Sequence, residues 1–148
     1  MSETAPETLV DYYRTNRFNP VLIHVEDAAV WADHVRKRLN LYEHHLCIPM
    51  GLLRGSEVLE VGCNSGENAL VLAAMGARLV LVEPNEQSWP RLRSLFEMFE
   101  LSDSVLDLSS CTLESFDSVR EFGLVIAEGF LSTLTDGKDM LAKVAAQI

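Results

Sequence analysis

The sequence predicts an α/β fold built around a mostly parallel sheet. Short apolar runs alternate with stretches of helical periodicity in the order strand, helix, strand, helix, strand, short helix, strand, helix. This alternation is typical of parallel strands joined by right-handed crossovers. Two glycines follow the first strand, where a tight turn leads into a helix. We therefore expect a three-layer sandwich, preceded by an N-terminal helical segment.

Composition limits the class of protein. The 148 residues suffice for one domain with a hydrophobic core, and the net charge of −10 argues against duplex nucleic acid as a partner. The first eight residues lack the basic and apolar regions of a signal peptide, and no apolar run approaches the roughly 20 residues of a membrane span. Cys47, Cys63 and Cys111 are widely spaced and indicate reduced thiols. These features predict a cytoplasmic protein with no membrane partner.

Residues 1–54 are predicted to form an arm and helices that serve as a cap or lid. The arm covers residues 9–24, and its aromatic side chains either cover the core or close over a site. A helix is expected over 26–39, because carboxylates suit its start and apolar residues repeat along one side. That stripe consists of Ala28, Ala32, Val35 and Leu39, and the basic last turn, from Arg36 to Arg38, is interpreted as solvated.

A second helix is expected from residue 41 to just before Pro49, because proline disfavours a helical residue ahead of it. This stretch carries the adjacent pair His44 and His45. Neighbouring residues on a helix diverge by about 100°, so this pair cannot easily hold one ion. No other cysteine or histidine lies at metal-ligand spacing, and no metal site is expected.

The sheet and its helices are predicted within residues 55–148. Four strands are expected at 58–61, 77–83, 104–108 and 122–128, each rich in apolar or β-branched residues. Helices are expected between Gly66 and Gly76, over 86–99, and from residue 132 or 136 to 148, with a short turn or helix within 109–116. In the 86–99 helix, residues at helical spacing indicate core packing: Trp89, Leu92, Phe96 and Phe99.

The glycine turn and the end of the second strand carry the candidate chemistry. Glu83 lies 21 positions after Gly62, where an acid can accept hydrogen bonds from both ribose hydroxyls of a ligand. A dinucleotide motif would have glycine at three positions where this chain has Gly62, Asn64 and Glu67. Glu67 would also bring negative charge toward phosphates. This pattern argues against NAD or FAD and favours a phosphate-free, cationic nucleoside, with Glu60 near its amino-acid end.

The pattern Glu60-x-Gly62-x-x-x-Gly66, followed by Glu83-Pro84-Asn85, resembles the first two motifs of class I S-adenosylmethionine-dependent methyltransferases. The resemblance covers roughly residues 55–135 and implies a Rossmann-like fold with S-adenosylmethionine as cofactor. It implies that the methionine and ribose are lined by Glu60, Gly62, Cys63, Asn64 and Gly66, that Glu83 binds the ribose hydroxyls, and that adenine lies near Pro84, Asn85, Thr112 and Leu113. It also implies that Glu128, at the end of the fourth strand, faces the methyl group and the substrate.

Each of these positions also has a purely structural interpretation. Gly62 and Gly66 could serve only a tight turn, and the two strand-end acids could be ordinary exposed carboxylates. For Glu128 and Cys111 the structural interpretation is at least as strong as the functional one. The acid that the family usually carries after the third strand is not evident, and Glu114 is the nearest substitute.

The implied function is transfer of a methyl group to an unidentified small-molecule acceptor. No catalytic residue is assigned, because a base is needed only if the acceptor is protonated. Upstream candidates for such a base are Tyr12, Tyr13, His24 and His44. A non-catalytic S-adenosylmethionine-binding or assembly module with the same fold is the alternative.

The predicted sheet stops after its fourth strand, whereas the family's sheet has seven strands. The fourth strand would then present an unpaired apolar edge. Three explanations fit: a fragment of a larger methyltransferase, a homodimer that covers the edge, or a shortened natural variant. We favour the fragment, and we expect residues 55–148 to be a partial cofactor-binding domain.

Overall fold

The computed structural model describes residues 23–129 and 137–148 of the chain. Four parallel strands form one sheet in the order β3-β2-β1-β4. Their bounds are β1 Glu57–Val61, β2 Arg78–Val82, β3 Val105–Ser109 and β4 Leu124–Ala127. The predicted parallel α/β architecture is confirmed, although most of the predicted arm lies outside the described residues.

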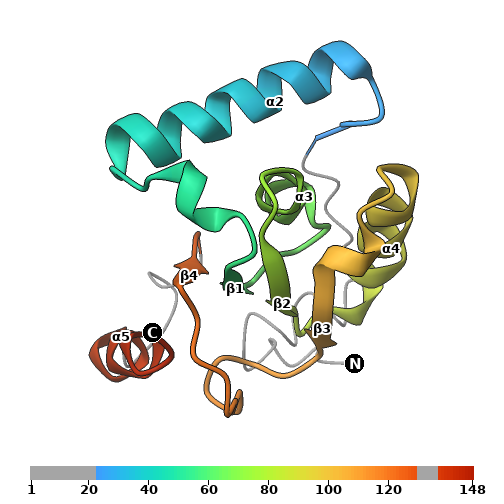
Figure 1. The fold of residues 1–148 in the computed structure, drawn as a ribbon. Helices are drawn as coiled ribbons and strands as arrows, with labels where there is room; N and C mark the ends of the chain where they lie inside the picture. Colours follow the sequence, from blue (N-terminus) through green and yellow to red (C-terminus); the bar gives the residue numbers. More distant parts are fainter. Residues whose placement is uncertain (1–22, 130–136) are drawn as a thin grey trace, which may run out of the picture.

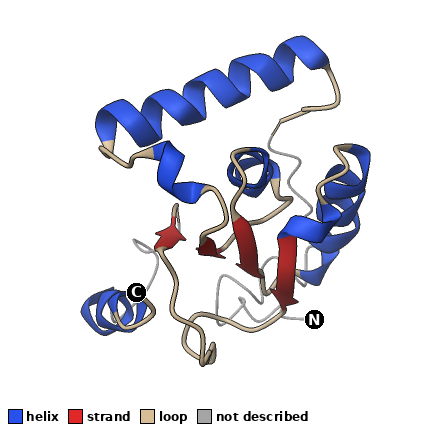
Figure 2. Cartoon of the chain, viewed as in Figure 1, coloured by secondary structure: helices blue, strands red, loops and turns tan. Residues whose placement is uncertain are grey.

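Helices flank this sheet on both faces (Figure 1). The α-helices are α2 Ala28–Asn40, α3 Glu67–Ala74, α4 Trp89–Met98 and α5 Gly137–Ala145. Short turns of other helix types are the π-helical η1 Leu41–His45 and the 3₁₀ turns η2 Met50–Leu53, η3 Glu86–Ser88 and η4 Ser102–Ser104. Helices α2, α3 and α4 lie on one side and α5 on the other, which gives three layers (Figure 2).

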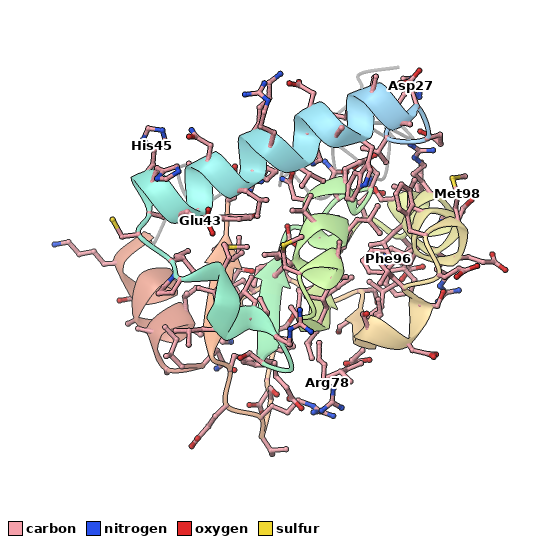
Figure 3. All side chains as sticks on the ribbon, turned by 45° about the horizontal axis from the view of Figure 1, so that its top comes forward. Asp27, Glu43, His45, Arg78, Phe96 and Met98 are labelled. Atoms are coloured by element: carbon pink, nitrogen blue, oxygen red, sulfur yellow. The ribbon has the colours of Figure 1, made fainter. Side chains whose placement is uncertain are left out.

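Each face of the sheet has its own hydrophobic core. Val58, Leu79 and Leu81 pack with the apolar sides of α3 and α4, and Leu59 and Val61 face the opposite core. In Figure 3, Phe96 points from α4 into the first core, whereas Met98 on the same helix is exposed. Because successive strand residues point to opposite faces, Glu60 lies on the Val58 side of the sheet, which α2 covers.

Two predicted elements, the helix after residue 41 and the fourth strand, are shorter than expected. The stretch after residue 41 forms one π-helical turn that continues α2, and Pro49 precedes a 3₁₀ turn. The fourth strand begins at Leu124, although the apolar run starts at Phe122. Phe122 is buried in the second core, so its apolar character reflects packing of a loop residue.

Helix α2 buries a different side from the predicted one. Asp27 caps its start by accepting hydrogen bonds from the backbone N–H groups of Ala29 and Val30, at 2.8 and 3.1 Å. Ala28 and Ala32 of the predicted stripe are exposed, and that part of the prediction is wrong. The buried positions are instead His34 and Arg38, and the prediction that Arg38 is solvated is also wrong, since only 8% of it is exposed.

Within the described ranges, no helix combines the length and apolar character needed to cross a membrane.

Candidate functional site

The glycine turn links the carboxyl end of β1 to the start of α3. Gly62 has a φ of +74° and donates a backbone hydrogen bond of 2.7 Å to Val82 at the end of β2. Gly66 has a φ of +89°, and a β-carbon there would lie 2.9 Å from the Leu92 side chain of α4. L-amino acids other than glycine rarely adopt this backbone region. The two glycines therefore allow a turn that lies close to both β2 and α4.

Glu83 is held by the backbone on both sides. Its Oε2 accepts a hydrogen bond of 2.7 Å from the N–H of Asn64, and its Oε1 accepts one of 2.8 Å from the N–H of Asn85. Burial raises the pKa of Glu83, and these two hydrogen bonds oppose the increase. Each carboxylate oxygen has a second acceptor position. Glu83 is therefore a buried, oriented acceptor and not an ordinary exposed strand end.

Further side chains connect the end of β2 to the glycine turn. Ser88 donates to the side-chain oxygen of Asn64 at 3.3 Å, and the indole N–H of Trp89 donates to the carbonyl of Glu83 at 3.1 Å. Asn85 is buried and accepts a hydrogen bond from the N–H of Gln87 at 3.3 Å. The half-buried Pro84 lies between Glu83 and Asn85 in the chain. The start of α4 therefore holds the turn and the strand end in one arrangement.

Glu60 of β1 is a deeply buried acid. Only 4% of it is exposed, and its Oε2 has no hydrogen-bond partner among the described residues. Burial raises the pKa of Glu60 to about 7, against the opposing influence of Arg38, with smaller contributions from repulsion by Glu128 and Glu83. An unpaired buried carboxyl of this kind favours either a proton or a ligand that donates a hydrogen bond.

Arg38 and Tyr42 complete the α2 side of this site. Arg38 donates to both carboxylate oxygens of Glu128 at 3.0 and 2.6 Å, and to the hydroxyl of Tyr42 at 3.2 and 2.5 Å. Burial disfavours the charged guanidinium, but the hydrogen bonds with Glu128 and Tyr42 outweigh it and raise the pKa of Arg38. Burial raises the pKa of Tyr42 to about 12, so this hydroxyl stays protonated at neutral pH.

Sequence reasoning missed both Arg38 and Tyr42 as site residues. The available signal was their spacing, because His34, Arg38 and Tyr42 recur every four positions and so share one helical face. The structure joins that face to Glu128, which sequence reasoning did name. Glu60, Glu83 and Glu128 lie at or next to the carboxyl ends of β1, β2 and β4, where Arg38 forms an ion pair with Glu128 and favours the charged form of Glu60.

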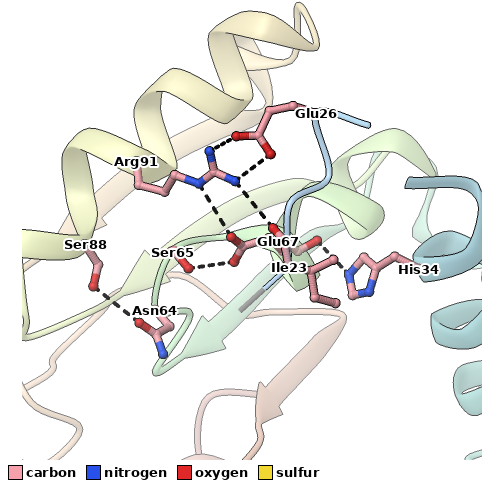
Figure 4. A network of polar contacts seen from close by, with 8 residues as sticks. All are labelled: Ile23, Glu26, His34, Asn64, Ser65, Glu67, Ser88 and Arg91. Carbon is pink, nitrogen blue, oxygen red and sulfur yellow. Dashed lines mark hydrogen bonds and ion pairs between the residues drawn. The ribbon is translucent and has the colours of Figure 1, made fainter. Parts of the chain in front are cut away.

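The charge of the Glu67 carboxylate is partly balanced by neighbouring side chains. It is fully buried at the start of α3, where Ser65 donates to its Oε2 at 2.7 Å and Arg91 lies 3.7 Å from its Oε1 (Figure 4). The protein itself therefore partly balances this charge, so the predicted repulsion of phosphates is weaker than the sequence suggests. Cys63 is also buried, and burial raises the pKa of its thiol well above the usual value.

The side chains of the loop after β3 mainly make structural contacts. Leu113 is buried in the second core with Val80 and Val82, so its side chain packs against the sheet. Thr112 is half-buried and its hydroxyl lies 3.2 Å from that of Ser115. Glu114 is exposed and its carbonyl accepts a hydrogen bond from Lys143 of α5. The contacts of these residues join the loop to the core and to α5.

Two of the four candidate bases, His24 and His44, lie in the part of the chain that the structure describes. Tyr12 and Tyr13 lie outside the described residues, and both His24 and His44 are exposed. The neighbouring His45 is 3.2 Å from the side chain of Asn40. Across residues 23–129 and 137–148, no group of three or more His, Cys, Asp or Glu residues is arranged to hold a metal ion.

Comparison with known proteins gives matches to solved structures only. No protein-family model and no curated protein matches the chain. The N-terminal domain of EvdMO1 with S-adenosylhomocysteine (SAH) bound matches 76% of this chain with a TM-score of 0.61 and 21% identity. A Burkholderia thailandensis 1,6-didemethyltoxoflavin-N1-methyltransferase, also with bound SAH, matches 100% of it with a TM-score of 0.58 and 21% identity. The chain has the class I methyltransferase fold.

The same fold occurs in a protein named for a different activity. The [4+2]-cyclase SpnF matches 77% of the chain with a TM-score of 0.64 and 19% identity. The chain spans 45% of the EvdMO1 domain structure, 61% of the toxoflavin enzyme and 41% of SpnF. The predicted Rossmann-like fold is thus confirmed, and the roles of individual site residues stay predictions.

Proposed function

We propose that the chain binds S-adenosylmethionine at the carboxyl ends of β1 and β2 and serves methyl transfer to a small molecule. The observation that carries this proposal is the arrangement of Glu83, whose two oxygens are oriented by the N–H groups of Asn64 and Asn85 beside the glycine turn. An acid in that position can accept hydrogen bonds from two neighbouring ribose hydroxyls. The presence of SAH in two structures with this fold supports the choice of ligand.

The turn and Glu60 would receive the amino-acid end of the cofactor. Gly62, Cys63, Asn64 and Gly66 form the turn, whose backbone can come close to a ligand where side chains are small or point away. The unpaired Oε2 of Glu60 is a hydrogen-bond acceptor for an ammonium group. The absence of phosphate groups in this cofactor fits a site whose strand ends carry carboxylates.

The adenine and methyl ends would lie against the remaining candidates. Pro84 and Asn85 follow Glu83 directly and are proposed to flank the adenine, with Thr112 and the backbone of Leu113 on its other side. Glu128 is proposed to face the methyl group and the acceptor, in an orientation that Arg38 fixes through two hydrogen bonds. No residue is assigned as a general base.

The chemistry needs little from the protein beyond positioning. The bound cofactor supplies a methyl carbon that its sulfonium already activates for displacement. The residues around it would orient the acceptor in line with that carbon and exclude water. The buried, preorganised contacts of Glu83 and Arg38 suit such a positioning role.

A non-catalytic binding module is the second candidate. The match to SpnF, a [4+2]-cyclase, leaves room for it only because a chain with this fold need not transfer methyl groups. Incubation with S-adenosylmethionine labelled in its methyl group, across a broad panel of acceptors, separates the two. Labelled product supports the methyltransferase, whereas cofactor binding without transfer to any acceptor supports the module.

Calorimetric titration with SAH tests the binding proposal. We expect saturable binding that Glu83→Ala weakens at least about a hundredfold, because two hydrogen bonds to a charged group are lost. The control is Asp107→Ala, which removes an exposed acid on β3 whose carboxylate accepts a hydrogen bond from the adjacent N–H of Leu108. The control should leave affinity unchanged. Absence of binding to the wild-type chain would refute the proposal.

A further inference from the structure

Three elements meet at Glu67 behind the glycine turn (Figure 4). Ser65, inside the turn, donates to its carboxylate at 2.7 Å, and Arg91 of α4 forms an ion pair with it at 3.7 Å. From α2, the Nε2 of His34 lies 3.2 Å from the backbone carbonyl of Glu67. The first turn of α3 therefore contacts both α2 and α4 through buried polar groups.

Arg91 also binds the chain that leads into α2. Its guanidinium forms two hydrogen bonds with the carboxylate of Glu26, one of them 2.9 Å long, and a third of 3.4 Å with the carbonyl of Ile23. The same side chain thus holds the segment before α2 on one side and faces Glu67 on the other. Its position depends on both carboxylates.

Burial makes this arrangement important for the turn. A fully buried carboxylate needs a nearby cation or hydrogen-bond donors, and Arg91 is the one cation within ion-pair distance of Glu67 among the described residues. Three positions before Arg91, Ser88 binds the side chain of Asn64 in the same turn. The segment formed by η3 and α4 therefore contacts the turn through Ser88 and the adjoining start of α3 through Arg91, and a shift of Arg91 would affect the second contact.

We propose that Arg91 is a positioning residue that couples the docking of α2 to ligand binding at the glycine turn. For the identity of the ligand, this inference rests on the proposed function. Glu26 fixes Arg91, Arg91 compensates Glu67, and Glu67 fixes Ser65 within the turn. Because α2 supplies Arg38 and the adjoining turn η1 supplies Tyr42, docking of this helical segment completes the other side of the same site. A ligand that stabilises the turn should in return stabilise docked α2, since such coupling is reciprocal.

The test removes Glu26, which lies outside the proposed binding residues. Glu26→Gln keeps the size of the side chain but removes the charge that holds Arg91. The matched control is Glu57→Gln, which breaks the ion pairs of Glu57 with Arg120 and Arg78 at the amino end of β1. We expect Glu26→Gln to raise the Kd for SAH about five- to tenfold, and the control to change it less than twofold.

Hydrogen exchange of the unliganded protein gives an independent readout. Glu26→Gln should speed exchange of backbone amides in both 28–40 and 64–70, and SAH should restore protection in both segments. Arg91→Lys should act in the same direction, because lysine keeps a charge but cannot reach both carboxylates with a planar fork. The control should leave both segments as in the wild type.

Two results separate this inference from the proposed function. If Glu26→Gln changes hydrogen exchange only in residues 23–40 and leaves both the exchange of residues 64–70 and the Kd for SAH unaltered, Arg91 only attaches the segment before α2 to α4. The inference is then overturned. If the wild-type chain binds no SAH, the proposed function fails. The role of Arg91 is then decided by hydrogen exchange of the unliganded variant: faster exchange of residues 64–70 supports the coupling, and unchanged exchange overturns it.

Discussion

The guanidinium of Arg38 binds both carboxylate oxygens of Glu128, which lies 90 positions later in the chain. The first residue lies on α2 and the second follows β4, so this pair connects the N-terminal helical segment to the edge of the sheet. Arg38 is buried, whereas the side chain of Glu128 is 49% exposed. The buried partner therefore depends more on the pair than the exposed one does.

Removal of Arg38 should destabilise the protein and loosen α2. Arg38→Ala leaves Tyr42 and Glu128 without their donor, and we expect the free energy of unfolding to fall by about 2–4 kcal/mol. Denaturation by urea measures this change. The control is Lys37→Ala, on the same helical turn, which loses only the exposed ion pair with Asp33 and should produce no measurable change. Equal effects of the two substitutions would contradict the structural role of Arg38.

Glu60 should make stability fall as the pH rises. Its folded-state pKa of about 7 lies above the ordinary 4.5, so the folded protein binds this proton more tightly than the unfolded chain does. The contribution is complete below about pH 4.5 and is lost as the pH rises through 7. The difference amounts to about 3 kcal/mol for one buried carboxyl.

Glu60→Gln removes this titration and keeps the shape of the side chain. Urea denaturation from pH 5 to pH 8 should show a smaller loss of stability in the variant than in the wild type. At pH 8 the variant should be the more stable protein, because it carries no buried charge there. Parallel pH profiles for the two proteins would show that Glu60 titrates normally.

Gly66→Ala should cost about 2–4 kcal/mol of unfolding free energy, because it combines an unfavourable φ with a clash against Leu92. Two other glycines separate these causes. Gly55 has a φ of +78° with open space around its β-carbon position, so its alanine variant should lose about 1–2 kcal/mol. Gly51 has neither constraint and should tolerate alanine. If Gly66→Ala costs no more than Gly55→Ala, contact with Leu92 is not decisive.

The glycine turn and the strand-end acid could be predicted because neighbouring residues determine them. Val58 to Val61 form an apolar strand, Gly62 follows it, and Glu83 ends the next strand at the spacing of one crossover unit. The contacts that orient Glu83 come from the N–H groups of Asn64 and Asn85, which belong to these same segments. Local sequence was sufficient for this half of the site.

The α2 side could not be predicted in the same way. Periodicity assigns polar residues to solvent, so the sequence predicts a solvated Arg38 and buried Ala28 and Ala32, and it offers no prediction for His34. Burial of these polar residues is possible because of partners that lie 33 and 90 positions away, Glu67 and Glu128. Such long-range pairs depend on the folded arrangement. In the sequence, only the four-residue spacing of His34 and Arg38 indicates that they share one helical face.

Ligand binding at the strand ends is tested most directly by an NMR titration of the ¹⁵N-labelled chain with SAH. The proposed site predicts saturable shifts that are largest for the backbone amides of residues 62–67, Glu83 and Asn85, with little change at the opposite, amino end of the sheet around Glu57 and Arg78. No saturable shifts, or shifts centred on that amino end, would contradict a cofactor site at the glycine turn.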